Sequence, residues 1–365
     1  MKIAIDARAL VSKRPAGKEK FTINVLEELF KLDKSNNYIL YLNQDFKGSL
    51  PANFFKRIIK APGIFWHFFV IIDLILRKPD LFFAPISYII PALNFFSKNI
   101  IVIYDLCVFL PPQTRPSFKT KVIEKIFLRS AIRNTKKVVT ISESTKKDII
   151  KYFPIASEKI SVIYPAVADN FRFIDDKQKC KFALDKFNLP KKFILFVGTL
   201  EPRKNLVRLI SAYHKLPNTC PLVIVGKRGW RYQEIFDKAE ELRLKDKIIF
   251  LDYVPTEDLP YLYNSAACFV YPSLYEGFGL PVLEAMACGA PVITSNVSSL
   301  PEAAGEAAIL VDPYNVDEIA MALNKILTNE NLRQDLREKG LKQAQKFFWR
   351  KTAQEILKIF LYRKL

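Results

Sequence analysis

Histidine, cysteine and glycine are scarce in this chain of 365 residues, which holds 2, 5 and 11 of them, respectively. The cysteine count is odd, and no two cysteines form a Cys-x-x-Cys pair. They lie at Cys107, Cys180, Cys220, Cys268 and Cys288. This pattern predicts free thiols in a reducing compartment rather than a disulfide framework or a zinc site. With so few histidines, a metal-centred enzyme has little ligand chemistry available.

Long apolar runs are also lacking. A spanning helix needs about 20 apolar residues, whereas the longest candidate, residues 64–76, carries His67 and Asp73. The first residues enter a strand-like segment, 2–6, without the apolar stretch and cleavage site of a secretory signal. We therefore expect a cytoplasmic protein. Half of the residues are hydrophobic and a quarter are charged, which excludes a disordered chain, a collagen-like fibre and a coiled-coil rod.

Acidic residues are too few to balance the basic ones. The chain has 37 acidic against 56 basic residues, for a formal net charge of +19. Residues 1–172 hold 28 basic and 14 acidic residues and thus carry +14 of that excess. Such a basic surface is typical of contact with a polyanion, either nucleic acid or an anionic membrane. A lysine-rich bias that only favours solubility is the alternative.

Short β-branched or aromatic runs alternate with amphipathic segments, which is typical of an α/β fold with parallel sheets. The strands expected in the first half are residues 2–6, 38–43, 81–84, 100–104, 138–141 and 160–163. Those expected in the second half are residues 193–199, 222–226, 248–252, 268–272, 292–295 and 309–312. At about 150 residues per domain, the length predicts two domains, 1–168 and 169–347. Residues 348–365 are expected to form a helix that packs back on the first domain.

Glycine placement distinguishes the two halves. Eight of the 11 glycines fall from Gly198 onward, and Gly198 and Gly226 close predicted strands. Ligands of parallel α/β sheets bind outside the carboxyl ends of the strands. The second domain is therefore expected to hold a small molecule, although any single glycine is explained equally well by a turn.

The densest motif is SLYEGFGLPVLEAMACG, residues 273–289. Gly277 and Gly279 permit a sharp turn into a helix whose N-terminus suits a phosphate. Glu284 lies among apolar residues, where a buried carboxylate needs hydrogen-bond donors such as the hydroxyl pair of a ligand. Stabilisation of the helix dipole by Glu284 is the alternative. Glu276, eight residues earlier, is placed to meet a second hydroxylated group.

A second motif, GTLEPRKN, spans residues 198–205. Arg203 and Lys204 are expected at the start of a helix, residues 204–216, where the helix dipole disfavours cations. A strongly anionic ligand such as a diphosphate explains this placement. A solvated surface pair is the alternative.

The Glu276-x7-Glu284 spacing within EGFGLPVLEAMACGAPV, together with GTLEPRKN and VGKRGW, resembles the retaining glycosyltransferases of family 4. These enzymes have the GT-B fold, in which two Rossmann-like domains face each other across a cleft. The segments MKIAIDARAL, VIYDL and VVTISESTKKDII are similar to the acceptor-binding domain of that family. The resemblance therefore covers nearly the whole chain, and GTLEPRKN and GKRGW are most similar to bacterial mannosyltransferases of O-antigen assembly.

The resemblance implies roles for the matching residues. Glu284 binds the ribose hydroxyls of a nucleotide sugar, Glu276 binds the sugar hydroxyls, and cations neutralise the leaving diphosphate. The catalytic residues implied are Glu276, Arg203, Lys204 and Asp105. The substrate-binding residues implied are Gly17, Tyr104, Thr199, Gly226, Val254, Gly277, Phe278, Gly279, Leu280 and Glu284. No metal or other cofactor is implied, since the nucleotide sugar is the donor substrate.

Three positions depart from the family pattern. Many members carry a histidine where this chain has Tyr104, so a histidine contact to the sugar is in doubt. The glycine-rich loop after the first strand has only Gly17, although Lys13, Arg14 and Lys18 are available to compensate. Many members have an arginine at Thr199, and Arg203 is expected to take that role.

The implied partners are a nucleotide-sugar donor and a saccharide acceptor, which we expect to be lipid-linked. GDP-mannose is the first choice of donor, with a UDP-sugar close behind. Lys121, Lys125, Arg129 and Arg133 recur every four residues on the expected helix 118–133 and form a cationic stripe. Such a stripe suits an anionic membrane and predicts peripheral association with the inner face of the cell membrane. A solvated helix face is the alternative.

Residues 64–76 are either a second, apolar membrane contact or a plain buried helix, and the buried helix is favoured. Three further functions are alternatives. A GT-B epimerase has motifs of a different branch. A nucleic-acid-binding protein needs a helix-turn-helix or a basic patch interleaved with aromatics, and the sequence shows neither. A catalytically inactive sugar-nucleotide-binding partner is the third.

Overall fold

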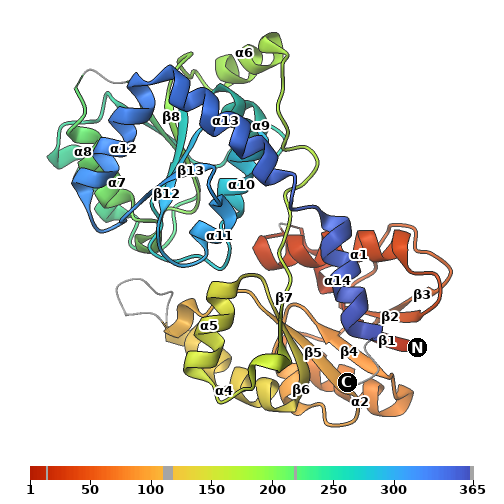
Figure 1. Ribbon diagram of the computed structural model, residues 1–365. Helices are drawn as coiled ribbons and strands as arrows, with labels where there is room; N and C mark the ends of the chain where they lie inside the picture. The colour runs from red at the N-terminus through yellow and green to blue at the C-terminus, as the bar shows by residue number, and fades with distance from the viewer. Residues whose placement is uncertain (14, 110–117, 218–219, 362–365) are drawn as a thin grey trace. The chain divides into compact units, whose positions relative to one another are not determined.

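The computed structural model describes residues 1–361 except residues 14, 110–117 and 218–219, and only the backbone of residues 118–125 (Figure 1). The chain divides into two compact units. The first unit contains Met1–Phe109, residues 118–165 and the segment from Trp349 onward. The second contains Ala166–Phe348.

The first unit is built on a seven-stranded parallel sheet with the order β3-β2-β1-β4-β5-β6-β7. Its strands are β1 (Lys2–Asp6), β2 (Asn37–Leu42), β3 (Phe54–Ile58), β4 (Leu81–Ala84), β5 (Lys98–Ile103), β6 (Thr135–Thr140) and β7 (Ile160–Val162). Six of them lie where the sequence predicts strands. The exception, β3, is an edge strand whose apolar run is interrupted by Lys56 and Arg57, so it lacks the continuous apolar run of a buried strand.

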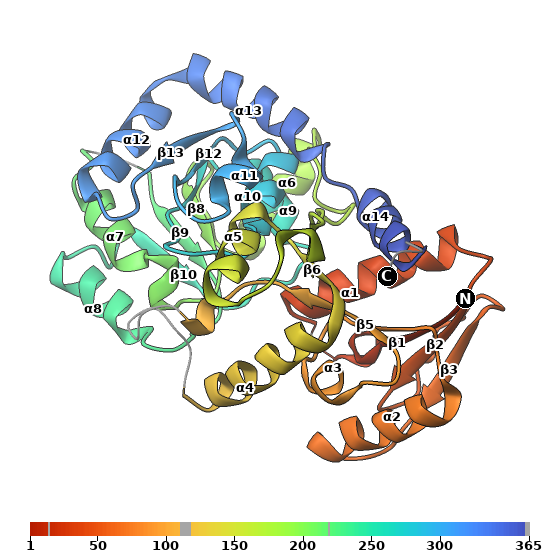
Figure 2. The same cartoon turned by 60° about the horizontal axis from the view of Figure 1, so that its bottom comes forward.

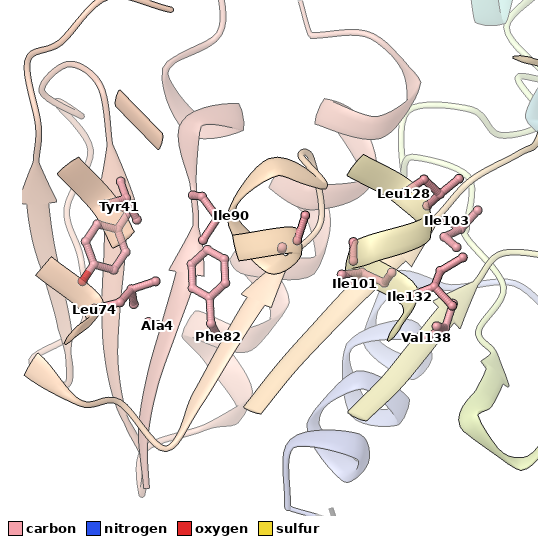
Figure 3. Packing of buried hydrophobic residues seen from close by; sticks show 14 of the residues in the cluster. Ala4, Tyr41, Leu74, Phe82, Ile90, Ile101, Ile103, Leu128, Ile132 and Val138 are labelled. Atoms are coloured by element: carbon pink, nitrogen blue, oxygen red, sulfur yellow. The ribbon is translucent and has the colours of Figure 1, made fainter. Parts of the chain in front are cut away.

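Helices cover both faces of this sheet. On one face lie α2 (Gly63–Arg77), α3 (Ile89–Leu93), α4 (Phe118–Asn134) and α5 (Glu143–Tyr152), which share one core with the strands. Figure 3 shows Leu74, Ile90 and Leu128 from three of these helices packed towards strand residues such as Phe82. Successive strand residues point to opposite faces, so Phe83 faces the other side.

The C-terminal helix α14 (Trp349–Leu361) belongs to that other face. It packs beside α1 (Gly17–Leu32), as Figures 1 and 2 both show, and its Phe360 ring meets Phe83 at a centroid distance of 5.2 Å. The Thr352 hydroxyl also donates a hydrogen bond of 2.8 Å to the Tyr164 carbonyl. The prediction that the C-terminal helix packs back on the first unit is confirmed.

The second unit contains a six-stranded parallel sheet with the order β10-β9-β8-β11-β12-β13. Its strands are β8 (Ile194–Val197), β9 (Leu222–Val225), β10 (Ile248–Leu251), β11 (Cys268–Tyr271), β12 (Val292–Ser295) and β13 (Ala308–Val311). Its helices are α6 (Lys177–Lys186), α7 (Leu206–His214), α8 (Gln233–Glu241), α9 (Leu259–Ser265), α10 (Leu280–Ala287), α11 (Leu300–Ala304), α12 (Val316–Thr328) and α13 (Glu330–Ala344).

The two sheets follow the same winding rule. In each, the first strand lies beside the fourth, and the chain winds outward in opposite directions from that pair. The point between these two strands, where the strand order reverses, is where α/β proteins bind ligands at the carboxyl edge of the sheet. In the second unit the pair is β8 and β11, and the two sequence motifs follow these strands directly. The α/β prediction with two Rossmann-like halves is thus confirmed.

Among the residues that the structure describes, none of the helices has the length and hydropathy needed to span a membrane.

We expect Phe360→Ala to lower the free energy of unfolding by about 3–5 kcal/mol, because it leaves a cavity between α14 and the sheet. Phe360 is only 1% exposed. Urea denaturation measures the change, and Leu361→Ala, the exposed neighbour on the same helix, is the control. Equal stability of the two variants would show that α14 does not hold the first unit together.

Candidate active site

The loops after β8 and β11 are tied to each other by hydrogen bonds. The Leu274 amide donates to the Arg203 carbonyl at 2.8 Å, and the Ser273 hydroxyl oxygen lies 3.1 Å from the same carbonyl. The Asn205 side-chain amide donates to the carbonyls of Pro272, at 2.9 Å, and Pro313, at 2.6 Å. These bonds fix the GTLEPRKN loop against the loop that carries Glu276.

Arg203 and Lys204 do not lie in the first turn of α7, contrary to the sequence-based expectation. They belong to a separate 3₁₀ turn, Pro202–Lys204, and Asn205 in a left-handed conformation (φ 64°) separates this turn from α7. The turn points the two cations at the β11 loop instead of along the α7 axis. The pairing of Arg203 and Lys204 with the protein's own carboxylates therefore explains their placement, in addition to the anionic ligand that the sequence predicts.

Glu276 is the centre of a buried network. Its carboxylate accepts hydrogen bonds from Lys204 Nζ at 2.5 Å, Arg203 at 2.8 Å and the Ser273 hydroxyl at 2.6 Å. The Tyr271 hydroxyl, at the end of β11, donates to Glu276 at 3.0 Å and accepts from Lys204. Glu276 and Lys204 are only 8% and 7% exposed. Several residues thus provide the hydrogen-bond donors that the buried Glu276 carboxylate needs.

The network is electrically balanced. Arg203 also pairs with Glu201, at 2.6 Å, so two cations face two carboxylates. Burial by itself raises the pKa of Glu276, but the charges of Arg203 and Lys204 outweigh it and lower the pKa to about 2. Burial and the Arg203 charge lower the pKa of Lys204. Glu276 is therefore ionised across the physiological pH range, and it offsets a positive charge that would otherwise be costly to bury.

The backbone of the Glu276 loop is also fixed. The Ser298 and Ser299 hydroxyls donate to the Glu276 carbonyl at 2.7 and 2.9 Å, and Ser298 accepts from the Glu276 amide. Gly279 then adopts a φ of 106° and starts α10. A Cβ at Gly279 would lie 2.7 Å from the Leu300 side chain. The loop therefore presents the N-terminus of α10 at the carboxyl edge of β11, where helix N–H groups suit an anion.

Glu284, on α10, is half-buried and accepts a hydrogen bond of 3.1 Å from the Tyr263 hydroxyl on α9. The protein itself thus supplies one of the hydrogen-bond donors that the sequence analysis expected a ligand to bring to Glu284. Burial and the Glu284 charge raise the pKa of Tyr263 well above its usual range. Binding of ribose hydroxyls by Glu284 stays a prediction.

The other residues expected around the donor differ in how they are placed. Thr199 is exposed after β8. Val254 and Phe278 are buried, at 4% and 2% exposure, and the Phe278 ring packs edge-on against Phe347. The side chains of these two residues are therefore not accessible to a ligand. Gly226 allows the loops after β8 and β9 to approach closely, because a Cβ there would lie 1.9 Å from the Gly198 carbonyl oxygen.

The expected residues of the first unit lie at the carboxyl edge of its own sheet. Tyr104 follows β5, its ring packs edge-on against Phe21, and its hydroxyl approaches the Lys18 carbonyl at 3.4 Å. This packing on α1 favours a structural role for Tyr104. Asp105 accepts a hydrogen bond of 2.9 Å from the Cys107 amide, and Gly17 is the exposed first residue of α1. Arg14 lies outside the described residues.

The sequence interpretation missed four members of the site: Glu201, Tyr263, Tyr271 and Ser273. Glu201 and Ser273 lie inside the two motifs, and Tyr271 ends a strand that enters one of them, so adjacency to the motifs was an available signal. Tyr263 had no such signal, because it reaches Glu284 from a different helix. Within the described part of the chain, no group of three histidine, cysteine, aspartate or glutamate residues is arranged to hold a metal ion.

Comparison with solved structures supports the fold. The chain matches the structure of Anabaena Alr3699/HepE in complex with UDP and glucose with a TM-score of 0.79 and 19% identity. The match covers 99% of this chain and 100% of the other. The two Rossmann-like units, the second with the N-terminus of α10 at the carboxyl edge of its sheet, thus define a protein of the GT-B fold.

Sequence comparisons identify the family. The group 1 glycosyl transferase profile matches residues 178–343, and the glycosyltransferase family 4 profile matches residues 49–171. O-antigen chain mannosyltransferase B of Escherichia coli is 36% identical over 273 residues, which are 72% of this chain and 71% of that protein. The serotype-specific mannosyltransferase WbdA of Escherichia coli is also 36% identical, over 72% of this chain and 33% of its own length. The chain belongs to glycosyltransferase family 4 and is a hexosyltransferase.

We expect Glu276→Gln to lower the free energy of unfolding by about 3–5 kcal/mol, because it leaves Lys204 buried without its counter-charge. Lys204→Met should also destabilise the protein. The double variant should lose less stability than the sum of the two single variants, as urea denaturation of all four proteins will show.

The same cycle on the exposed pair Lys339–Asp335, with Lys339→Met and Asp335→Asn, is the matched control and should show far weaker coupling.

Acid denaturation gives a second measurement of the Glu276 network. The stabilisation due to Glu276 is complete above its ordinary pKa of 4.5 and is lost as the pH falls towards 2. Wild type should therefore lose more stability over this interval than Glu276→Gln. Additive single variants, or equal acid sensitivity, would contradict this description of the network.

Proposed function

We propose that this protein transfers a mannosyl group from GDP-mannose to a saccharide acceptor and retains the anomeric configuration. The observation that carries this proposal is the buried Glu276–Arg203–Lys204 network at the carboxyl ends of β8 and β11. The choice of mannose is supported by the two mannosyltransferases of Escherichia coli that are 36% identical to this chain.

The donor is proposed to bind along the carboxyl edge of the second sheet. Arg203 and Lys204 face its diphosphate, the amides from Gly277 to Leu280 bind phosphate and sugar oxygens, and Glu284 accepts from the ribose hydroxyls. Glu276 and Glu201 hold the cations in place before the donor arrives. Charges held in this way need no reorganisation when negative charge develops on the leaving group, which is the main source of electrostatic catalysis.

The transfer step needs no base from the protein. The bond between the sugar C1 and the diphosphate oxygen breaks while the acceptor hydroxyl oxygen bonds to C1 from the same face. The hydroxyl proton passes to the phosphate oxygen of the departing GDP, and Arg203 and Lys204 stabilise the negative charge on that group. Asp105 is proposed to act on the acceptor side of the reaction, in the first unit.

The acceptor is proposed to be a lipid-linked saccharide of a surface polysaccharide, reached by peripheral binding at the inner face of the cell membrane. The excess charge of +14 in residues 1–172 supports this placement. On α4, Arg129 and Arg133 are exposed, while the side chains of Lys121 and Lys125 lie outside the described residues.

A UDP-sugar is the second candidate donor, because the structural neighbour with a TM-score of 0.79 was solved with UDP and glucose. A sugar-nucleotide-binding partner without transferase activity is the other alternative.

We expect GDP and GDP-mannose, without added metal, to raise the melting temperature of the protein more than UDP compounds do. A ligand at about 100 times its Kd adds about 2.7 kcal/mol of stability. A thermal-shift panel of nucleotides and nucleotide sugars measures this effect, and the panel is repeated with magnesium added. A preference for UDP compounds would replace the mannosyl donor, and no shift with any nucleotide would contradict a nucleotide-sugar site.

We expect Arg203→Lys to reduce kcat by about 10²–10³, which is the usual effect of losing one donor to a developing negative charge. The variant keeps the charge but loses the geometry by which arginine bonds Glu201, Glu276 and the Tyr275 carbonyl. Transfer of radiolabelled sugar measures the rate. Arg231→Lys, in an exposed pair with Glu234, is the control, and equal activity of both variants would remove Arg203 from the mechanism.

A further inference from the structure

The outward face of α2 carries large apolar side chains that no described residue of the first unit covers. These side chains are between 39% and 75% exposed, and they are Ile64, Phe65, Phe68, Phe69, Ile72 and Leu76. At 100° per residue they fall within an arc of about 140°. The favoured prediction for residues 64–76, a plain buried helix, is therefore wrong, because only one side of α2 is buried.

Two polar residues of α2, Asp73 and His67, are buried, whereas Arg77, at the last position of the helix, is exposed. Asp73 is bonded by Arg57 and Arg77, each at 2.7 Å, and by the Tyr41 hydroxyl at 2.9 Å. The Nε2 atom of His67 lies 3.2 Å from the Ser87 hydroxyl. An ordinary surface helix turns its charged residues to water. This helix buries its aspartate and exposes phenylalanine, isoleucine and leucine.

The exposed apolar surface extends beyond α2. Leu93, Phe95 and Phe96, at and after the end of α3, are exposed by 48%, 71% and 60%. Ile126 on α4 is exposed as well. α3 contacts both α2 and α4, and all three helices pack on the same core, as Figure 3 shows. Their outward faces therefore lie on the same side of the sheet, and Figure 2 shows these three helices together along the lower edge of the first unit.

Cations border this surface. An open depression of about 470 Å³ is lined by Phe95 and Phe96 together with Lys98 and Lys136, so rings and ammonium groups share one border. Residues 60 to 100 are all described, and their exposed charged side chains are Lys60, Arg77, Lys78 and Lys98 against one acid, Asp80. Arg129 and Arg133 add two more exposed cations on α4.

We propose that the outward surface of α2, α3 and α4, here called the docking face, binds an anionic phospholipid bilayer. Exposed aromatic and aliphatic residues beside cations are typical of helices that lie in the membrane interface. The apolar side chains of α2 enter the boundary between headgroups and acyl chains, while the cations pair with lipid phosphates. This inference builds on the proposed lipid-linked acceptor by naming the surface that brings the enzyme to it.

Charge distinguishes the bilayer from a second copy of this chain. Two docking faces that met each other would bring their cations together with few acids to offset them, at a cost in repulsion. Anionic lipids neutralise the same cations. The sequence put the cationic α4 first as the membrane contact, and the structure adds α2, which exposes six large apolar side chains.

The test is flotation of the full-length protein with vesicles of phosphatidylcholine alone and of phosphatidylcholine mixed with phosphatidylglycerol. Wild type should bind the mixed vesicles, and the triple variant Phe65→Ser, Phe68→Ser and Phe69→Ser should bind at least about tenfold more weakly. The matched control replaces three exposed apolar residues of the second unit, Phe182→Ser, Tyr314→Ser and Met321→Ser, and should bind like wild type. Thermal denaturation verifies that both variants are folded.

A charge variant separates the two contributions. Arg129→Glu with Arg133→Glu and Lys136→Glu should abolish the preference for phosphatidylglycerol, and added salt should weaken wild-type binding in the same way. Light scattering measures the oligomeric state in parallel. Unchanged flotation of the phenylalanine variant would overturn the proposal, as would a wild-type dimer that this variant converts to monomer.

Flotation is independent of catalysis, so the two proposals fail separately. Vesicle binding without any nucleotide-induced thermal shift would leave the docking face in place and reject the transferase function. A thermal shift with GDP-mannose but no vesicle binding would do the reverse.

Discussion

The Glu276 carboxylate, held between Arg203 and Lys204, is the interaction on which the organisation of the second unit depends. It joins the loop after β8 to the loop after β11, at the point where the strand order of the sheet reverses. Without it, two cations would face each other in a site largely screened from water, and such a site is unstable. The carboxylate allows positive charge to be stored where an anionic ligand is expected to bind.

The burial of two cations explains why so many polar residues surround Glu276. Tyr271 bonds both Glu276 and Lys204, Ser273 bonds Glu276, and Glu201 bonds Arg203. The Glu276 backbone is held by Ser298 and Ser299. A buried polar network stabilises a protein only when its donors and acceptors are satisfied. The same bonds keep the cations in one geometry, so the requirement of folding and the requirement of electrostatic catalysis are met by one set of contacts.

The two units share a sheet topology but differ in which residues depart from ordinary burial. The second unit buries ionised groups at the carboxyl edge of its sheet, whereas the first unit leaves apolar groups exposed on the helices that cover one sheet face. In α2 the buried Asp73, bonded by two arginines, leaves the outer side free of charge. In both units, the residues to which we assign a function break the ordinary rule of apolar inside and polar outside.

The sequence by itself determined twelve of the thirteen strands that the structure describes and the family, because these depend on local periodicity and on short motifs. Six strands of each sheet, the C-terminal helix and the segment with Glu276 and Glu284 lie where the sequence places them. Edge strand β3 was missed because two of its five residues are exposed and the apolar pattern is broken. Only the tertiary structure decided the contacts that cross between elements.

Tyr263 reaches Glu284 from another helix, and Asn205 separates Arg203 and Lys204 from α7 through bonds to Pro272 and Pro313. The orientation of α2 was also beyond the sequence. The periodicity of α2 separates Asp73 and His67 from its exposed phenylalanines, and only packing against the strands of the first sheet decided that the side with Asp73 is the buried one.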